Sequence, residues 1–461
     1  MSPAQEEHVD IVVLGAGSGG YAAALRAAEL GQHVVLVEAS RVGGTCLHSG
    51  CIPTKALLHA GHVADQVRNA PALGVRAELT GVDIAAVNAY KDGVVGRLHK
   101  GLQGLIAARQ VEVVSGYGRL VSADTVAVGE RLIRADHVVL ATGSRSRSLP
   151  GLPIGGRVMT SDQALVMDWI PRSVVIVGGG VIGVEFASLW RSFGAEVTIV
   201  ETQSRLLPAE DEAVSTALQR AFRKRGITVR ADTRISDVAD DGSGVHLTLD
   251  DDSTLAAEAV LVAVGREPVS DDMGFSEIGI ELEQGFVNTD EHLHTGVGNV
   301  YAVGDLVAGL QLAHRGFAHG IFVAEKIAGQ NPAPIDESQI PRVTYCDPEV
   351  ASVGLTEAQA RQAHGGEAIE TVEYNLAGNG RSQIMGASGF VKMIRQIDGP
   401  IIGVHMIGTG MSEQIAEGQL TVGWQAYPED LAPLLHAHPT QNEALGEAAL
   451  ALAGKPLHSH N

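Results

Sequence analysis

The segment Gly43–Lys55, GGTCLHSGCIPTK, contains two of the three cysteines in a chain of 461 residues, and four residues separate Cys46 from Cys51. Such a pair could hold a metal, form a structural disulfide, or open and close as a redox couple. A zinc site needs about four ligands, usually in two close pairs, and Cys346 is distant in the sequence. A disulfide that closes so short a loop removes little chain entropy. The pattern therefore favours redox chemistry and predicts no metal site.

The residues around Cys51 indicate which thiol ionises more easily. Pro53 suits the first turn of a helix, so we expect Cys51 just before a helix N-terminus. The positive end of a helix lowers the pKa of a nearby thiol. Lys55 adds a positive charge about one turn further along. The sequence therefore predicts a thiolate at Cys51.

An internal repeat indicates the elements that position this pair. Val9–Glu38 and Ser173–Glu201 each read as a strand, a glycine loop, an amphipathic helix and a second strand that ends in an acidic residue. Each acid lies 23 positions after the first glycine of its repeat. The fingerprint glycines are Gly15, Gly17, Gly20, Gly178, Gly180 and Gly183. One such motif can be a close-packed turn without a ligand. Two complete copies predict two bound dinucleotides, with pyrophosphates at helix N-termini and acids on the riboses.

Composition limits the partners and the compartment. The chain carries 33 Lys and Arg against 54 Asp and Glu, a formal charge of −21, which argues against a nucleic-acid or anionic-membrane partner. It contains no run of 18 apolar residues, so no membrane span is expected. The start, MSPAQEEHVD, has no basic region of a signal peptide. The few cysteines suggest a reducing cytosol, so the expected localisation is cytoplasmic.

The rest of the chain completes an α/β fold. Apolar runs at Ala135–Ser144, before Pro268 and at Asn299–Gly309 read as strands that end at ligands. Residues 331–341 read as a linker, and an α+β pattern without a third fingerprint follows. We predict two Rossmann-like dinucleotide-binding domains and a C-terminal α+β domain. The expected boundaries are 1–147 and 271–339 for the first dinucleotide domain, 148–270 for the second, and 340–461 for the third.

Together these motifs resemble the flavin-dependent pyridine nucleotide–disulfide oxidoreductases over essentially the whole chain. The resemblance implies that the first fingerprint binds FAD and the second binds the nicotinamide cofactor. It implies that Cys46 exchanges with substrate, Cys51 contacts the flavin, and Lys55 lies near the flavin's reactive nitrogen. The implied FAD contacts are Gly15, Gly17, Gly20, Glu38, Thr45, Lys55, Ala141, Thr142, Gly143, Asp305, Ala313 and His314. The implied nicotinamide-cofactor contacts are Gly178, Gly180, Gly183, Glu185, Glu201 and Gly265.

Three features are similar to the lipoamide-oxidising members of the family. Glu201 and the absence of basic residues before Arg205 favour NAD over NADP, because a carboxylate repels a 2′-phosphate. The run Leu312–Gly320 is similar to one that follows their FAD-binding Asp. In the tail, the resemblance implies that His438 is the general base and that Glu443 orients its ring.

The resemblance further implies a homodimer in which this dyad reaches the partner's cysteines, and an α+β dimerisation domain. The implied reaction is oxidation of dihydrolipoamide, a small dithiol carried on the lipoylated acyltransferase of a 2-oxo acid dehydrogenase complex. Alternatives are an NAD(P)H-dependent reductase of a low-molecular-weight disulfide of the glutathione or mycothione type, a mercuric-reductase-like flavoprotein, and a redox-inert FAD- and NAD-binding protein. His48, Ser49 and Asn442 depart from the commoner motif and leave the shape of the substrate open, and the sequence assigns no role to Cys346.

Overall fold

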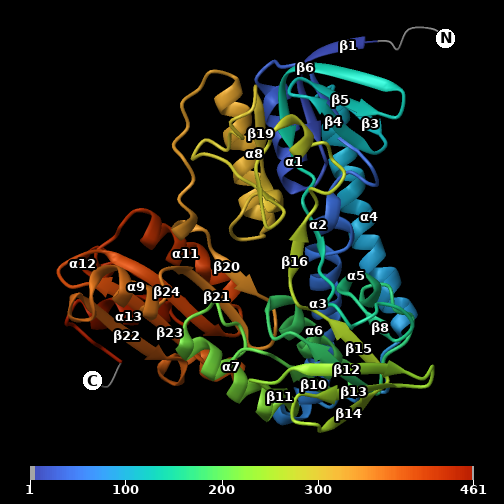
Figure 1. The fold of residues 1–461 in the computed structure, drawn as a ribbon. Helices are drawn as coiled ribbons and strands as arrows, with labels where there is room; N and C mark the ends of the chain where they lie inside the picture. The colour runs from blue at the N-terminus through green and yellow to red at the C-terminus, as the bar shows by residue number, and fades with distance from the viewer. Residues whose placement is uncertain (1–5, 459–461) are drawn as a thin grey trace.

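Two sheets with parallel cores and one antiparallel sheet organise the chain (Figure 1). The structure, a computed structural model, describes residues 6–458. Among these residues, no helix is both long and apolar enough to traverse a lipid bilayer.

The first sheet has the order β3-β2-β1-β6-β5-β4, and β19 pairs with β6. Its strands are β1 Glu6–Leu14, β2 Val34–Glu38, β3 Glu112–Ser115, β4 Gly118–Ser122, β5 Thr125–Val128, β6 Arg131–Leu140 and β19 Val300–Ala302. β1 runs parallel to β2 and β6, and Leu14 is in register with both Val37 and Leu140. The first glycine loop and residues 141–143 therefore leave the same sheet edge.

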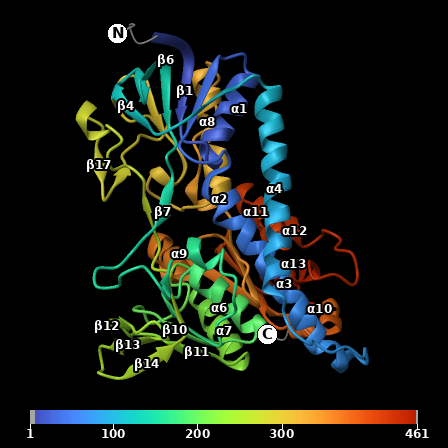
Figure 2. The ribbon, with the colours of Figure 1, turned by 90° about the vertical axis from the view of Figure 1, so that its right-hand side faces the viewer.

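Four longer helices surround this sheet and extend from it. They are α1 Ser18–Glu29, α3 Cys51–Asn69, α4 Ile84–Ala108 and α8 Ala313–Ile327, and the short α2 Gly44–His48 precedes α3. α1 and α8 pack closely, because Gly320 brings α8 against the backbone of Gly19. α3 and α4 lie side by side and run towards the second sheet (Figure 2). The cysteine-bearing segment is thus held between the two sheets.

The second sheet repeats the arrangement with five parallel strands in the order β11-β10-β9-β15-β8. They are β8 Val158–Met159, β9 Ser173–Val177, β10 Glu196–Val200, β11 Ile227–Arg230 and β15 Ala259–Val262. Its helices are α5 Ser161–Ala164, α6 Val181–Phe193 and α7 Glu212–Lys224, and β12 Ile235–Asp240, β13 Val245–Leu249 and β14 Thr254–Ala257 form an antiparallel sheet beside it. Val177 is in register with Val200 and Val262, which matches the alignment in the first sheet.

A short antiparallel ribbon joins the two halves. β7 Ser144–Ser146 carries the chain out of the first half, and β16 Arg266–Pro268 carries it back. The chain then forms β17 Leu282–Glu283 and β18 Phe286–Val287 before β19 rejoins the first sheet. The segment between these two strands, residues 147–265, is therefore inserted between two parts of the first half.

The third sheet is antiparallel, in the order β20-β21-β24-β23-β22. Its strands are β20 Arg342–Thr344, β21 Glu349–Gly354, β22 Ile369–Asn375, β23 Phe390–Gln396 and β24 Ile401–Gly408. Its helices are α9 Glu357–His364, α10 Gly380–Met385, α11 Met411–Gly423, α12 Pro428–Leu431 and α13 Glu443–Leu452. The fold thus has the predicted α/β class with a C-terminal α+β part.

Candidate active site

A cavity of about 590 Å³ lies where the two glycine loops face the cysteine segment. Many of the residues expected at the site line it: Gly15, Gly17, Glu38, Thr45, Cys46, Cys51, Lys55, Ala141, Thr142, Gly143, Gly180, Glu185, Gly265, Asp305 and Ala313. Others lie outside its lining: Gly20, Gly178, Gly183, Glu201, His314, His438 and Glu443. The structure therefore brings both fingerprints and the thiol pair to one space.

The glycines of each fingerprint fall into two kinds. A Cβ at Gly20 would collide with the carbonyl oxygen of Gly15, so Gly20 serves the packing of helix against loop. A Cβ at Gly17 or Gly180 would meet nothing within 4 Å, and both line the cavity. They are the N-caps of α1 and α6 and leave the first helical N–H groups without a side-chain cap. The open space and the free donors fit two pyrophosphates.

The two acids at the ends of β2 and β10 are held in the same way. Glu38 accepts hydrogen bonds from the backbone N–H groups of Ala16 and Ser40, each at 2.8 Å. Glu201 accepts from the backbone N–H groups of Gly179 and Gln203, at 2.5 and 2.7 Å. Each carboxylate thus holds the backbone of its own glycine loop. The spacing in the sequence predicted a contact with ribose but did not indicate this second role. The Arg205 guanidinium donates to the carbonyls of Pro208 and Glu210, so it is engaged within its own loop.

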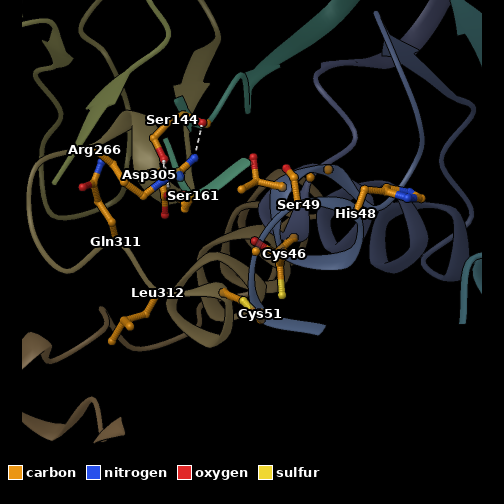
Figure 3. Close-up of a pocket in the computed structure, with 18 of the residues that line it drawn as sticks. Cys46, His48, Ser49, Cys51, Ser144, Ser161, Arg266, Asp305, Gln311 and Leu312 are labelled. Carbon is orange, nitrogen blue, oxygen red and sulfur yellow. Dashed lines mark hydrogen bonds between the residues drawn. The ribbon is translucent and has the colours of Figure 1, made fainter. Parts of the chain in front are cut away.

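Cys46 and Cys51 are both free thiols in the structure, and their sulfurs reach into the same space (Figure 3). Cys46 donates a hydrogen bond to Cys51, which raises the pKa of Cys46 and, with the Lys55 charge, lowers the pKa of Cys51 to about 7 against the opposing effect of burial. Cys51 is the first residue of α3, with Gly50 as N-cap, so the helix begins earlier than Pro53 suggests. The first helical residues need no N–H partner within the helix, and Pro53 therefore fits inside the first turn.

Lys55 is fixed by a buried carboxylate. Its Nζ lies 3.0 and 2.9 Å from the two carboxylate oxygens of Glu185, which is 3% exposed. Burial lowers the pKa of Lys55, but the charge and hydrogen bonds of Glu185 outweigh it and leave the pKa raised. Glu185 also accepts from the backbone N–H of Tyr345, whose ring lies 4.7 Å from Nζ. Lys55 therefore keeps its positive charge beside Cys51, where it lowers the pKa of the thiol and the charge of Glu185 partly offsets it.

Asp305 is held by a chain of hydrogen bonds that the sequence did not predict. Ser144 donates its hydroxyl proton to the carboxylate of Asp305 at 2.6 Å (Figure 3). Arg266 donates from Nε to the same hydroxyl oxygen at 2.8 Å, which directs the Ser144 proton towards Asp305. Ser144 follows the predicted Gly143, and Arg266 follows Gly265, but only the β7–β16 ribbon places them together. His314, by contrast, bonds the carbonyl of Pro341 through Nε2 at 2.8 Å.

The histidine–glutamate dyad stands apart from this cavity. His438 Nδ1 lies 2.8 Å from Glu443, which also accepts from the backbone N–H of Thr440. Burial raises the pKa of Glu443, but these two hydrogen bonds outweigh it and lower the pKa. The His438 side chain is 77% exposed. An imidazole oriented in this way can accept a proton at Nε2 from a group outside its own chain's cavity.

Glu417 on α11 holds the loop that carries the dyad. One carboxylate oxygen lies 2.7 Å from His436 Nε2, and the other accepts from the side chain of Asn442 at 2.9 Å. These contacts lie on either side of His438 in the sequence. No pattern in the sequence indicated Glu417, because it lies in a helix distant from the tail motif.

The sequence matches the pyridine nucleotide-disulphide oxidoreductase family over residues 9–320 and the dimerisation domain of that family over residues 340–449. The chain therefore belongs to this family.

Relatives and a solved structure agree with this assignment over almost the full length. A dihydrolipoyl dehydrogenase of Bacillus subtilis is 39% identical, with 97% of this chain and 99% of the relative covered. A dihydrolipoyl dehydrogenase of Geobacillus stearothermophilus is 37% identical, with 97% of each covered. The crystal structure of LpdA from Mycobacterium tuberculosis superposes with a TM-score of 0.90 at 27% identity and covers 96% of this chain and 99% of that one. The fold class and the expected family are confirmed.

Proposed function

We propose that this chain is a FAD- and NAD-dependent oxidoreductase that oxidises protein-bound dihydrolipoamide to lipoamide and passes the electrons to NAD⁺. Full-length similarity to dihydrolipoyl dehydrogenases supports this activity. The observation that carries it is the placement of the Cys46–Cys51 pair between two glycine loops in one cavity. A dithiol can react there while both cofactors lie within reach.

The first glycine loop would hold FAD and the second would hold NAD. Gly17 and the N-terminus of α1 offer the pyrophosphate site for FAD, and Asp305 offers a carboxylate oriented by Ser144. Gly180 and the N-terminus of α6 offer the equivalent site for NAD. FAD, when bound, takes two electrons from a dithiol and releases them as hydride to NAD⁺.

The thiols act by disulfide exchange. With the pair oxidised, one substrate thiolate attacks Cys46 Sγ, the Cys46–Cys51 bond breaks, and Cys51 leaves as a thiolate that Lys55 stabilises. The second substrate thiolate attacks the substrate sulfur bonded to Cys46. This closes the lipoamide ring and releases Cys46, which takes the proton of the second substrate thiol, so substrate dithiol and enzyme disulfide have exchanged two electrons.

His438 supplies and removes the protons of this exchange. It accepts the proton of the attacking substrate thiol, because a thiol with a pKa near roughly 8.5 is mostly protonated at neutral pH. We propose that the chain works as a homodimer and that His438 serves Cys46 of the partner chain. The dimerisation domain and the exposure of His438 support this arrangement.

The partner would be the lipoylated acyltransferase of a 2-oxo acid dehydrogenase complex, and the compartment would be the cytoplasm. Steady-state assay of the FAD-loaded protein with dihydrolipoamide and NAD⁺ tests the activity. We expect NADH to form in proportion to dihydrolipoamide consumed. NADH oxidation by glutathione- or mycothione-type disulfides, without dihydrolipoamide turnover, would instead establish the low-molecular-weight disulfide reductase.

A further inference from the structure

One backbone carbonyl closes the loop that carries Cys46, and two histidines share it. The carbonyl oxygen of Val42 lies 2.9 Å from Nε2 of His48 and 3.1 Å from Nδ1 of His99. The two rings meet edge to face, with centroids 4.9 Å apart. His48 ends α2, two residues after Cys46, whereas His99 belongs to α4. The His48 side chain points away from the sulfurs, so it does not act on the thiols directly (Figure 3).

The protons of both rings are fixed by this arrangement. A carbonyl oxygen only accepts hydrogen bonds, so His48 carries its proton on Nε2 and His99 carries one on Nδ1. Nδ1 of His48 is buried and has no hydrogen-bond partner among the residues that the structure describes. Burial lowers the pKa of His48, and the neighbouring His99 and Arg41 lower it further, against the hydrogen bond to Val42 and the charge of Glu38. The lowered pKa favours the neutral ring, which keeps one donor.

The loop needs such support. α2 has five residues, too few to be stable as a helix by itself. Gly44 has a φ of +58°, and a Cβ there would lie 2.6 Å from Cα of Gly17, so one side of the loop is pressed against the first glycine loop. On the other side of the loop, the Val42 carbonyl accepts hydrogen bonds from His48 and His99. These bonds connect residue 42 to residue 48, on either side of Cys46, and connect both to α4.

We propose that His48 and His99 are positioning residues that together fix the loop of residues 42–48, so that the Cys46 thiol stays within reach of Cys51 each time the disulfide opens and closes. The proposal rests on the proposed function for the identity of the redox pair. It gives a role to His48, one of the departures from the commoner motif, and to a second histidine 51 positions further along the chain.

The two rings donate from different nitrogens, which allows a sharp test. A Gln amide nitrogen occupies about the place of Nε2, and an Asn amide nitrogen about the place of Nδ1, so H48Q and H99N keep the donors. H48L and H99L remove them. We would measure the alkylation rate of Cys46 in the reduced, FAD-loaded dimer and the equilibrium of the thiol pair with a dithiothreitol redox buffer. We expect about threefold to tenfold faster alkylation and a shifted equilibrium in each Leu variant, and values near wild type in H48Q and H99N.

Because one carbonyl is shared, the H48L/H99L double variant should show less than the product of the two single effects. His59→Ala, at an exposed position of α3, is the matched control. Leu variants that react like wild type, or Gln and Asn variants that differ from wild type as much as the Leu variants do, would overturn the proposal. If H48L fails to bind FAD, the comparison of H99L with H99N and the wild-type protein tests the proposal. Alkylation does not require turnover, so a protein inactive towards dihydrolipoamide would refute the proposed function and leave this comparison intact.

Discussion

Cys51 accepts a hydrogen bond from Cys46 and lies near the Lys55 ammonium, and together these lower its pKa to about 7 although burial opposes them. A thiolate next to a bound flavin gives long-wavelength charge-transfer absorption. We expect Cys46→Ser, loaded with FAD, to show this band without any reductant, and the band should grow as the pH rises, because the deprotonated form donates the charge. Titration of visible absorbance measures it. A band in Cys51→Ser would contradict the assignment of Cys51.

Glu201 is expected to select NAD. Its carboxylate lies at the end of β10, and the Arg205 guanidinium is engaged by backbone carbonyls of its own loop, so this arginine is not placed for a 2′-phosphate. We expect kcat/KM for NADH to exceed that for NADPH by roughly a hundredfold or more in the reverse reaction. Glu201→Ala should reduce this ratio and also lower Tm, because Gly179 and Gln203 lose their acceptor. Equal kcat/KM values in the wild-type protein would show this reading to be wrong.

Helix α11 positions the dyad through Glu417. Removing the Glu417 carboxylate would leave His436 and Asn442 without their common partner and free the loop between them. We expect Glu417→Ala to lower kcat/KM by about tenfold to a hundredfold, since small misplacements of a catalytic group are costly. FAD absorption should not change. Glu413→Gln, exposed on the same helix, is the control and should behave as wild type. Wild-type kinetics in Glu417→Ala would contradict a positioning role.

Elements that a short, continuous stretch of residues specifies could be predicted from the sequence. The two strand–loop–helix–strand repeats have alternating composition and glycines at fixed spacing, and both formed as expected. The thiol pair and its helix were predicted for the same reason. The roles of Glu417 and His99 and the Ser144–Arg266 contact could not be predicted from the sequence. Each depends on contacts between residues far apart in the chain, and therefore on how helices and strands pack. The start of α3 also differed, since the backbone turn at Gly50 decides it rather than Pro53.

The separation of His438 from the cavity of its own chain leads to a test by subunit mixing. Cys46→Ser and His438→Ala should each be nearly inactive as homodimers. In mixed dimers one site carries both lesions and the other carries none. With random pairing about half the dimers are mixed, so the activity of co-refolded material should reach roughly a quarter of wild type. Demonstrated mixing without activity above that of the parents would rule out a site shared between chains.

Buried histidines predict how stability depends on pH. Burial lowers the pKa of His405, which is 0% exposed, and of His319, which is 1% exposed. In the unfolded chain these rings protonate near about pH 6.5, while in the folded protein they stay neutral to lower pH. The unfolded state therefore binds more protons, and Tm should fall as the pH decreases from 6.5 towards 5. His405→Gln keeps the hydrogen bond to the Leu355 carbonyl and should reduce this slope. A flat Tm over that range would contradict the prediction.

The β7–β16 ribbon has a consequence for protein engineering. The chain enters and leaves the segment of residues 147–265 through two strands that lie next to each other, so this segment has one covalent junction with the first half. A homologous cassette with a different nucleotide preference could be grafted there without altering the path of the remaining chain. The graft must keep Glu185, which fixes Lys55, and the contact between α3 and α6, where Asp65 accepts from the Ser192 hydroxyl. It must also keep Glu210 and Asp211, which pair with Arg342 and Lys392 of the C-terminal part. Nucleotide choice is thus a property that can be exchanged as a block, while the thiol chemistry stays with the host.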